Sequence, residues 1–405
     1  MQLNFTFAPP SRLVTSFFMA AAVFYFIASV VFYGLDFLNI SYLDPQAVGF
    51  IHLFMLGFMM SVIFGAMYQL ISVVLEIKLY SNDLAYAHLG LFLIAIVPFT
   101  ISFLYPEAFE FLGYGSIILY ISFLLYITNV LLSILKIKKF DIKGYFILTI
   151  HVILFFGVTY GLLTSLGLIH GGLGFDTISL AHTHITLVLF GFAGGLMSII
   201  ATVLLPMFML SHNFDKKISN YILIGIIAGS VFAIWGWFFL ARVAIMGTIL
   251  AFTYQLYDIF KKRMRKHLDV YAQDMITSGL FLILTTILLP FITNEKVMKV
   301  FIIFLILGFI SSFIVGHIYK IVPFLVWNEK FAPLVGKEKV PMLADMVDEK
   351  YAQIEFNSKL ATIAFLTLGI LFESSFLVTI GKVLFIINAL LVAWNVIYIF
   401  RYKGD

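Results

Sequence analysis

Long apolar segments alternate with short polar ones along the whole chain, and each apolar segment has the length of a membrane span. A helix needs roughly 17 to 25 mainly apolar residues to cross a bilayer. We therefore predict an all-α, polytopic membrane bundle of about 12 transmembrane helices, built as a single integral membrane domain over residues 1–405. The expected spans are 12–34, 47–76, 84–105, 109–136, 144–168, 178–209, 218–239, 242–260, 270–292, 297–322, 358–375 and 378–400.

The distribution of basic residues predicts the orientation of these spans. If the N-terminus is cytoplasmic, the cytoplasmic loops, both tails and the adjoining helix ends hold 21 of the 25 Lys and Arg residues. Because cytoplasmic loops carry the excess of Lys and Arg, both termini are expected inside the cell. A long cytoplasmic loop is expected at about 324–357. The first apolar segment is too long for a signal-peptide core and is expected to stay as a span.

Composition excludes several classes of protein. The chain is 62% hydrophobic and 11% charged, which excludes a soluble enzyme and leaves too few charges to follow a nucleic-acid backbone. There is no cysteine, so disulfides, iron–sulfur clusters, thiolate metal sites and c-type haem attachment are excluded. A metal would have to bind histidine, carboxylate, methionine or backbone oxygen. The nine histidines are therefore the main candidates for chemistry.

A spaced motif recurs in three of the expected spans. Gly57-Phe58 is followed by Gly65 and Tyr68, and Gly308-Phe309 is followed by Gly316 and Tyr319 at the same offsets. Gly191-Phe192 begins the same pattern without the later pair. Because these spans are four helices apart, the pattern predicts three four-helix repeats around a pseudo-threefold axis. The alternative is that the glycines mark close helix packing that arose separately.

Three histidines lie about one turn into spans that begin at the outer face. His52 is in the second span, and His182 and His184 form a His-Thr-His motif in the sixth. Two imidazoles from separate helices at matched depth are suited to binding a haem iron from both sides. His52 and His184 are the expected pair, with His182 as the ligand of a second haem or a copper ion and His170, in the preceding loop, as a further metal ligand. The alternative is a hydrogen bond from each ring to a backbone carbonyl.

Two other groups of residues are candidates of lower rank. Arg242 follows Trp235 and Trp237 near the outer face, where this set could hold haem propionates or act as an interfacial anchor. His88, His151 and His317 lie near the inner face. They could form a second site or a proton path, but separate, internally satisfied polar groups are the favoured interpretation.

Two stretches resemble known membrane proteins. Residues 180–208, LAHTHITLVLFGFAGGLMSIIATVLLPMF, resemble the His-x-His helix of subunit I in the haem–copper oxidase superfamily. Residues 64–93, FGAMYQLISVVLEIKLYSNDLAYAHLGLFL, are similar to a helix–loop–helix of its bacterial members, including nitric oxide reductases. The resemblance covers about a third of the chain. It implies low-spin haem ligation by His52 and His184, and binding of the high-spin haem by His182.

The sequence also differs from that superfamily, and the differences exclude some of its functions from the expectation. Its His-x-His motif is on the tenth helix, whereas here it is on the sixth, and its copper site needs a His-His pair that this chain lacks. Three clustered imidazoles for a copper ion are not evident, so a proton-pumping oxidase is not expected. Twelve-span haem- and copper-containing proteins of the bacterial nitric-oxide stress response also carry His-x-His near a helix start.

The expected function is therefore a membrane protein that binds b-type haem, one or two per chain. It would transfer electrons, or bind or reduce a diatomic gas such as O2 or NO, and receive electrons from a respiratory or c-type cytochrome partner. Copper is a further candidate cofactor. The alternatives are a transporter for a metal or small solute, and a cofactor-free structural subunit of a respiratory complex. In every case the bilayer is the main partner and nucleic acid is not one.

Overall fold

The computed structural model describes residues 7–138, 140–171, 174 and 176–403, and every regular element in this part of the chain is a helix. Eleven helical segments are long and apolar enough to cross a membrane, and Ile218–Ile234 is a shorter apolar helix of 17 residues. They confirm the predicted all-α, multi-pass class. The eleven segments are Ser11–Gly34, Pro45–Ser72, Asn82–Leu104, Phe111–Ile134, Ile142–His170, Thr177–Met209, Phe238–Lys261, Val270–Phe291, Glu295–Lys330, Glu349–Leu371 and Ser375–Arg401.

The chain divides into two compact units. The first comprises Met1–Pro10 and Tyr68–Lys266, and the second comprises Ser11–Met67 and His267–Asp405. The boundary falls within the helix α3 (Ser61–Val74). Each unit is described by itself below, and the interpretation of residues 1–405 as one domain stays a prediction.

In the first unit, neighbouring helices along the chain pack against one another as antiparallel pairs. The helix α4 (Asn82–Leu104) packs along α5 (Phe111–Ile134), and α9 (Ile218–Ile234) packs along α10 (Phe238–Lys261). The long helix α6 (Ile142–His170) contacts α5 on one side and the segment that begins at α7 (Thr177–Ile185) on the other. Large aromatic side chains such as Phe92, Phe146 and Phe192 are fully buried between these helices.

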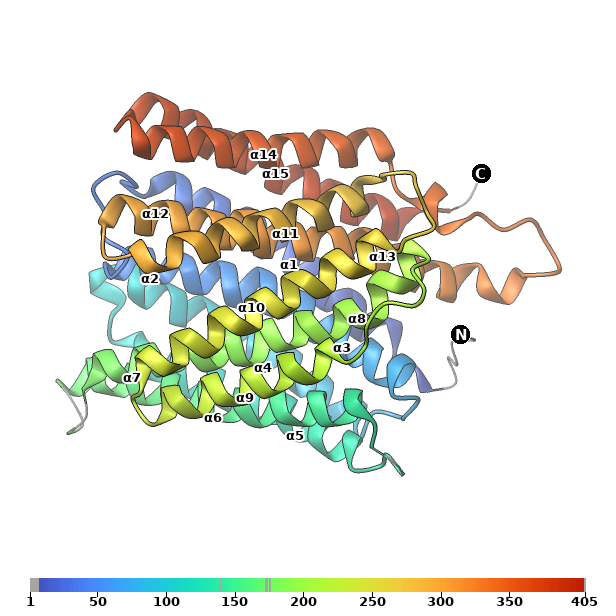
Figure 1. The fold of residues 1–405 in the computed structure, drawn as a ribbon, viewed down its shortest axis with the longest axis horizontal. Helices are drawn as coiled ribbons and strands as arrows, with labels where there is room; N and C mark the ends of the chain where they lie inside the picture. Colours follow the sequence, from blue (N-terminus) through green and yellow to red (C-terminus); the bar gives the residue numbers. More distant parts are fainter. Residues whose placement is uncertain (1–6, 139, 172–173, 175, 404–405) are drawn as a thin grey trace. The chain divides into compact units, whose positions relative to one another are not determined.

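The second unit has the same kind of pairing. The helix α14 (Glu349–Leu371) lies beside α15 (Ser375–Arg401), as Figure 1 shows in red, and α1 (Ser11–Gly34) packs on α15. The helix α11 (Val270–Leu288) packs along α13 (Ser311–Lys330). The core between them is aromatic, because Tyr25 is buried against Phe54, Phe58 and Phe385.

Three of the spans contain a π-helical segment, and these are the three spans that carry the Gly-Phe motif. The segment η2 (Leu53–Met60) follows α2 (Pro45–His52), η4 (Thr186–Gly194) follows α7 and precedes α8 (Gly195–Met209), and η6 (Phe304–Ile310) follows α12 (Glu295–Ile303). π-helical turns are rare in proteins, and those that occur often lie at functional sites. Each segment contains the glycine of its motif, so the recurring sequence coincides with a recurring backbone feature.

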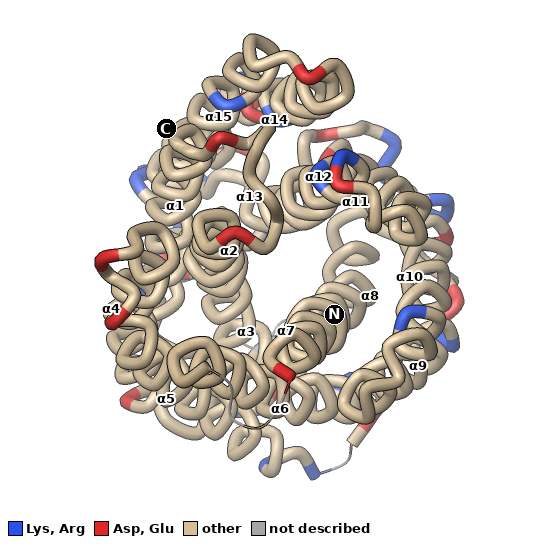
Figure 2. Tube along the Cα trace, turned by 90° about the vertical axis from the view of Figure 1, so that its left-hand side faces the viewer, with Lys and Arg blue, Asp and Glu red and all other residues tan. Residues whose placement is uncertain are grey.

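Side-chain caps mark where many of the helices begin. Asp141, Asp176, Asp269 and Asp348 each accept hydrogen bonds from backbone amides of the first turn of the helix that follows. A carboxylate at this position satisfies amides that have no partner within the helix and interacts favourably with the helix dipole. Figure 2 shows acidic positions at the starts of α2 and α7.

The tenth and eleventh spans are longer than the sequence indicates. The tenth continues through Pro323 to Lys330, and the eleventh begins at Glu349 rather than at 358. The loop expected at 324–357 is therefore shortened to 331–348, which contains two short 3-10 turns, Ala332–Leu334 and Leu343–Met346. The error arose because charged residues that continue a helix beyond an apolar segment interrupt the apolar pattern without ending the helix.

Candidate functional site

His184 is held in the first unit by the glycine-lined face of α6. Its Nδ1 lies 2.9 Å from the carbonyl oxygen of Gly157. A Cβ atom on Gly161 would lie 2.7 Å from the same nitrogen, so only glycine leaves room for the ring at this position. Because a carbonyl oxygen only accepts hydrogen bonds, Nδ1 carries the proton and Nε2 is the basic nitrogen of the ring. This is the tautomer in which histidines commonly bind metals.

The start of the helix that carries His184 is fixed by Asp176. The carboxylate of Asp176 accepts hydrogen bonds from the Ser179 hydroxyl at 2.6 Å and from the backbone amides of Ile178 and Ser179. The hydrogen bond from the Ser179 hydroxyl, with that from the Ile178 amide, holds the pKa of this carboxyl below its usual range. The ionised carboxylate of Asp176 thus stabilises the N-terminus of folded α7.

His52 is the last residue of α2 in the second unit and is half-buried. Its Nδ1 lies 2.9 Å from the carbonyl oxygen of Val48, one turn earlier in the helix. His52 therefore has the same tautomer as His184, with Nε2 as its basic nitrogen. Both residues also begin a π-helical segment: η2 starts one residue after His52, and η4 starts two residues after His184.

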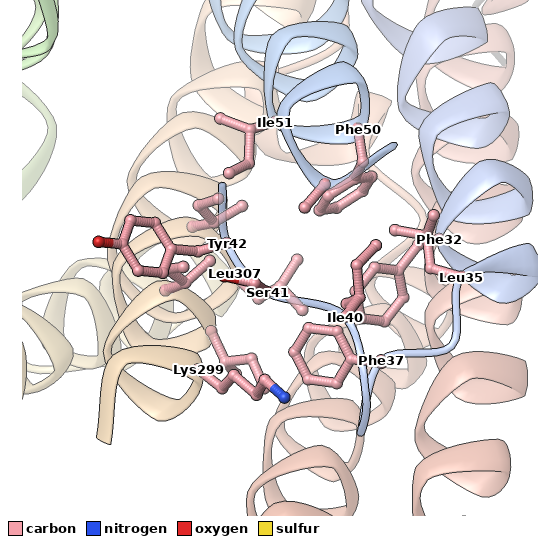
Figure 3. Close-up of a pocket in the computed structure, with 14 residues that line it drawn as sticks. Phe32, Leu35, Phe37, Ile40, Ser41, Tyr42, Phe50, Ile51, Lys299 and Leu307 are labelled. Carbon is pink, nitrogen blue, oxygen red and sulfur yellow. The ribbon is translucent and has the colours of Figure 1, made fainter. Parts of the chain in front are cut away.

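An apolar cavity lies beside the segment that carries His52. Figure 3 shows Phe50 and Ile51 of α2 on one side of it and Phe37 and Lys299 on the other. The Lys299 Nζ donates to the carbonyl oxygen of Leu38 at 2.5 Å, so its charge is directed to the backbone. The cavity volume of about 40 Å³ is large enough for a very small molecule and far too small for a porphyrin. It is not a haem pocket.

The other candidate residues, expected from the sequence near the outer face, are exposed. His182 contacts the ring of Phe238 edge-on at 5.6 Å, and His170 ends α6. Trp235 and Trp237 are 68% and 52% exposed, with ring centroids 5.7 Å apart in the turn that precedes α10. Arg242 is exposed on α10. Exposed tryptophans beside an arginine are typical of an interfacial anchor, and their role in holding haem propionates stays a prediction.

Two of the three inner histidines belong to one cluster in the first unit. The Tyr68 hydroxyl lies 2.9 Å from His88 Nδ1, and the Tyr126 hydroxyl lies 3.0 Å from His151 Nε2. The ring centroids of His88 and Tyr126 lie 5.3 Å apart with the planes tilted by 38°, so four helices contribute to a continuous Tyr/His cluster. The favoured expectation of separate polar groups was wrong for these two. His317 is a separate group in the second unit: its Nδ1 lies 2.7 Å from the Phe313 carbonyl oxygen, and its buried Nε2 has no hydrogen-bond partner among the described residues.

The second unit contains a charged cluster that sequence reasoning missed. Lys359 Nζ lies 2.7 Å from Asp274 Oδ1 and 3.3 Å from Glu355 Oε1, and all three side chains are at most 2% exposed. Asp274 is the fifth residue of α11. The signal for Glu355 and Lys359 was their spacing of four residues at the start of the eleventh span, because that spacing places both on one face of a helix.

The described residues contain no group of three or more His, Asp or Glu side chains placed to hold a metal ion. Ligation of a haem iron needs only two imidazoles, so this finding bears on a copper site rather than on haem. No protein-family model and no curated protein matches the chain. The resemblance to haem–copper oxidases and the pairing of His52 with His184 stay predictions.

Proposed function

We propose that the chain is a b-type haem protein of the membrane, with His52 and His184 as axial ligands of the iron. The observation that carries the proposal is that both rings have Nδ1 bonded to a backbone carbonyl at 2.9 Å and both stand at the start of a π-helical segment. Such a carbonyl fixes the ring orientation and makes Nε2 a stronger ligand. The bound haem would supply one-electron transfer or binding of a diatomic gas.

The roles of the neighbouring candidates follow from their positions. His182 is two residues from His184, about 200° around the helix, so it would face a second haem or a copper ion rather than the first. A respiratory or c-type cytochrome is the proposed electron donor. Both termini would lie in the cytoplasm, on the strength of the distribution of Lys and Arg. The resemblance to bacterial members of the haem–copper oxidase superfamily favours a bacterial inner membrane.

We also propose that the twelve helices form three four-helix repeats. In all three π-helical segments the motif glycine packs against the preceding helix so closely that a Cβ atom would clash. Gly57 meets Phe24, Gly191 meets Ile153 and Gly308 meets Phe281. The second glycine of the motif makes the same type of contact: Gly65 meets Phe17 and Gly316 meets Asp274. In both spans, the residue that the second glycine meets lies seven positions before the residue that the first glycine meets.

Hydrogen bonds support the equivalence of the first and third repeats. In one, Tyr68 bonds His88, and the Ser122 hydroxyl donates to the His88 carbonyl at 3.2 Å. In the other, Tyr319 donates to Glu355 at 3.2 Å, and the Asn388 amide donates to the Glu355 carbonyl at 2.9 Å. Tyr68 and Tyr319, which occupy equivalent positions of the motif, thus bond His88 and Glu355, which occupy equivalent positions in the span that follows. The position five residues before the motif glycine is His52 in the first repeat, Thr186 in the second and Ile303 in the third. His184 lies seven residues before its motif glycine, so the two proposed ligands do not occupy equivalent positions.

The proposal is tested by measuring haem in the purified protein. We expect a Soret band and b-type haem in a pyridine haemochrome assay, and a loss of at least about tenfold in bound haem in His52→Ala and in His184→Ala. His212→Ala is the matched control, because this histidine is exposed in a loop. Wild-type-like spectra in both ligand variants would contradict the assignment. A colourless protein that carries metal into vesicles would favour a transporter, and one that co-purifies with a cytochrome would favour a structural subunit.

A further inference from the structure

The cluster of Asp274, Glu355 and Lys359, here called the buried triad, lies within the second unit. Asp274 and Glu355 are 0% exposed and Lys359 is 2% exposed. If all three groups were ionised, two carboxylates and one ammonium would leave a net charge of −1. An uncompensated charge buried in a membrane protein is very costly. The triad therefore requires one more positive charge.

The hydrogen bonds show where that charge binds. Both oxygens of Glu355 accept hydrogen bonds, Oε1 from Asn388 at 2.7 Å and Oε2 from Tyr319 at 3.2 Å, which stabilise the ionised carboxylate. Asp274 is bonded only through Oδ1, to Lys359. Its Oδ2 is fully buried beside Gly316 and has no hydrogen-bond partner among the described residues. Of the two carboxylates, Asp274 is the poorly solvated one.

We propose that the buried triad is a proton-binding site within the membrane that holds one exchangeable proton on Asp274. The proton adds to one oxygen of the Asp274 carboxylate, forming a single O–H bond, and water is its source. The net charge of the triad then changes from −1 to zero, while Glu355 and Lys359 remain an ion pair. This inference does not depend on haem binding by His52 and His184.

Polar residues connect the triad to one end of the second unit. Asp274 lies about 6 Å along α11 from its first residue, and Glu355 lies about 9 Å along α14 from its first residue. At these helix starts the Gln273 and Gln353 amides bond each other at 3.0 Å, and Lys320 pairs with Asp269 at 2.7 Å. The two charged side chains of that outer pair are about a fifth exposed. Protons from the aqueous phase can thus approach the triad from this end.

The network is closed on its other side. Asn388 accepts a hydrogen bond from the Tyr25 hydroxyl at 2.9 Å, which lies 3.0 Å from the Ser311 hydroxyl. Beyond that point, Tyr25 is enclosed by aromatic rings, with the ring of Phe58 at 4.2 Å. A site open to one end only is suited to taking up and releasing a proton on the same side.

The titratable groups nearest to the triad are Tyr25 of α1 and Tyr319 of α13, since both experience the charges of Asp274 and Glu355. The helix α15 presents the neutral Asn388 and Asn395. Charged or titratable side chains on the other elements around the triad have partners of their own. These pairs are Lys296 with Glu373, Lys299 with the Leu38 carbonyl, Lys320 with Asp269 and His317 with the Phe313 carbonyl.

The proposed repeats indicate that the fold does not require these charges. Asp274 meets Gly316 as Phe17 meets Gly65. Glu355 of α14 corresponds to His88 of α4, so Lys359, four residues after Glu355, corresponds to Phe92. In the first repeat, apolar side chains thus take the places of Asp274 and Lys359, while His88 takes that of Glu355, so the charged cluster is not repeated there. Because an ion cluster is more costly to bury than an apolar one of similar volume, its presence in a single repeat points to a use for the charge.

The test counts protonated carboxyl groups by infrared difference spectroscopy of the full-length protein in nanodiscs, comparing neutral with alkaline buffer. We expect one carbonyl band of a protonated carboxylic acid in the wild type. The band should be lost in Asp274→Asn, and also in Glu355→Gln, because Asp274 and Lys359 then form a neutral ion pair. Restoring the imbalance in Glu355→Gln/Lys359→Met should restore the band. Glu373→Gln is the control, since this glutamate pairs with Lys296 outside the triad.

Several outcomes would overturn the proposal. A wild type without the band would show a fully ionised triad. A band that persists in both Asp274→Asn and Glu355→Gln would place the proton elsewhere. A band that appears only after sodium is replaced by choline would identify the occupant as a metal cation instead. Size-exclusion profiles of each variant show whether it has folded, and Glu355→Gln keeps the test decisive if Asp274→Asn does not fold.

Discussion

At the scale of single residues, the position of His184 depends on the absence of a side chain at Gly161 of α6. The ring lies where a side chain of Gly161 would otherwise be, and its proton is directed to the carbonyl of Gly157. Two glycines one turn apart thus provide both the space and the acceptor. The orientation of a ligand is often set by such neighbours as much as by the ligand itself.

Gly161→Ala should therefore move the His184 ring without removing it. An added methyl group overpacks the site and costs about 1 to 3 kcal/mol, while alanine favours a helix over glycine by about 1 kcal/mol. We expect a net loss of stability and a lower haem content or a shifted Soret band. The free energy of unfolding and the absorption spectrum of the purified variant measure the two effects.

Gly247→Ala is the matched control for this substitution. Gly247 also lies inside a helix of the first unit, but a Cβ atom there would have no neighbour within 4 Å. It should show only the gain in helix propensity and leave the spectrum unchanged. Equal stability and equal spectra in the two variants would show that the Gly161 position does not hold the His184 ring.

Sequence reasoning at this scale identified residues more readily than their partners. The positions of His52 and His184 near helix starts follow from hydropathy and spacing. Their carbonyl partners differ, however: Val48 is four residues away in the same helix, whereas Gly157 is on another helix. The first contact follows from helix geometry. The second depends on how two helices pack, which the apolar pattern does not determine.

At the scale of elements, α7 depends on its N-terminal cap. The pKa of Asp176 is lowered in the folded protein by the hydrogen bonds from Ser179 and Ile178, so the ionised cap stabilises α7 above the ordinary pKa of an aspartate, about 3.9. This stabilisation is lost as the pH falls through the lower, folded-state pKa. The cap therefore stabilises α7 at neutral pH, and its contribution changes with pH only in the acidic range.

Asp176→Ala should lower the apparent melting temperature at neutral pH, and the difference from the wild type should shrink as the pH falls toward and below that of an ordinary aspartate. Asp176→Asn should lose less, because an asparagine oxygen also caps a helix. Scanning fluorimetry over a series of pH values measures both. Glu110→Ala is the control, because Glu110 precedes α5 without a side-chain cap. A difference that grows toward acidic pH would contradict the assignment.

Helix identity could be predicted from the sequence, but helix geometry could not. The predicted span 12–34 differs from α1, Ser11–Gly34, by one residue, because the apolar stretch ends where the helix does. The π-helical segments gave no advance signal. Their residues, such as LFMLGFMM in η2, would be equally suitable for an ordinary apolar α-helix. The recurring Gly-Phe motif indicated a repeat without indicating its backbone.

At the scale of the whole molecule, the most informative contacts join residues far apart in the sequence. Lys359 and Asp274 are separated by 85 positions, and Tyr25 and Asn388 by 363. Each residue alone reads as an isolated polar interruption of an apolar helix. Only the packing of the helices shows that these residues meet. The hydropathy pattern along the sequence indicates how deep a residue lies in the membrane, but it does not indicate which helix faces adjoin.

The number of spans is the global property that remains to be measured, and it depends on the 17-residue helix Ile218–Ile234. Because the chain has no native cysteine, single cysteines report the sidedness of individual positions. Glu107→Cys and Lys266→Cys both replace exposed residues, and four long helices and this short one lie between them. With twelve spans, the five crossings place the two positions on opposite faces. If Ile218–Ile234 does not cross, four crossings place them on the same face. We expect a membrane-impermeant maleimide to label Glu107→Cys in intact spheroplasts and to label Lys266→Cys only after permeabilisation. Labelling of both before permeabilisation would reduce the bundle to eleven spans and contradict the arrangement of three equal repeats.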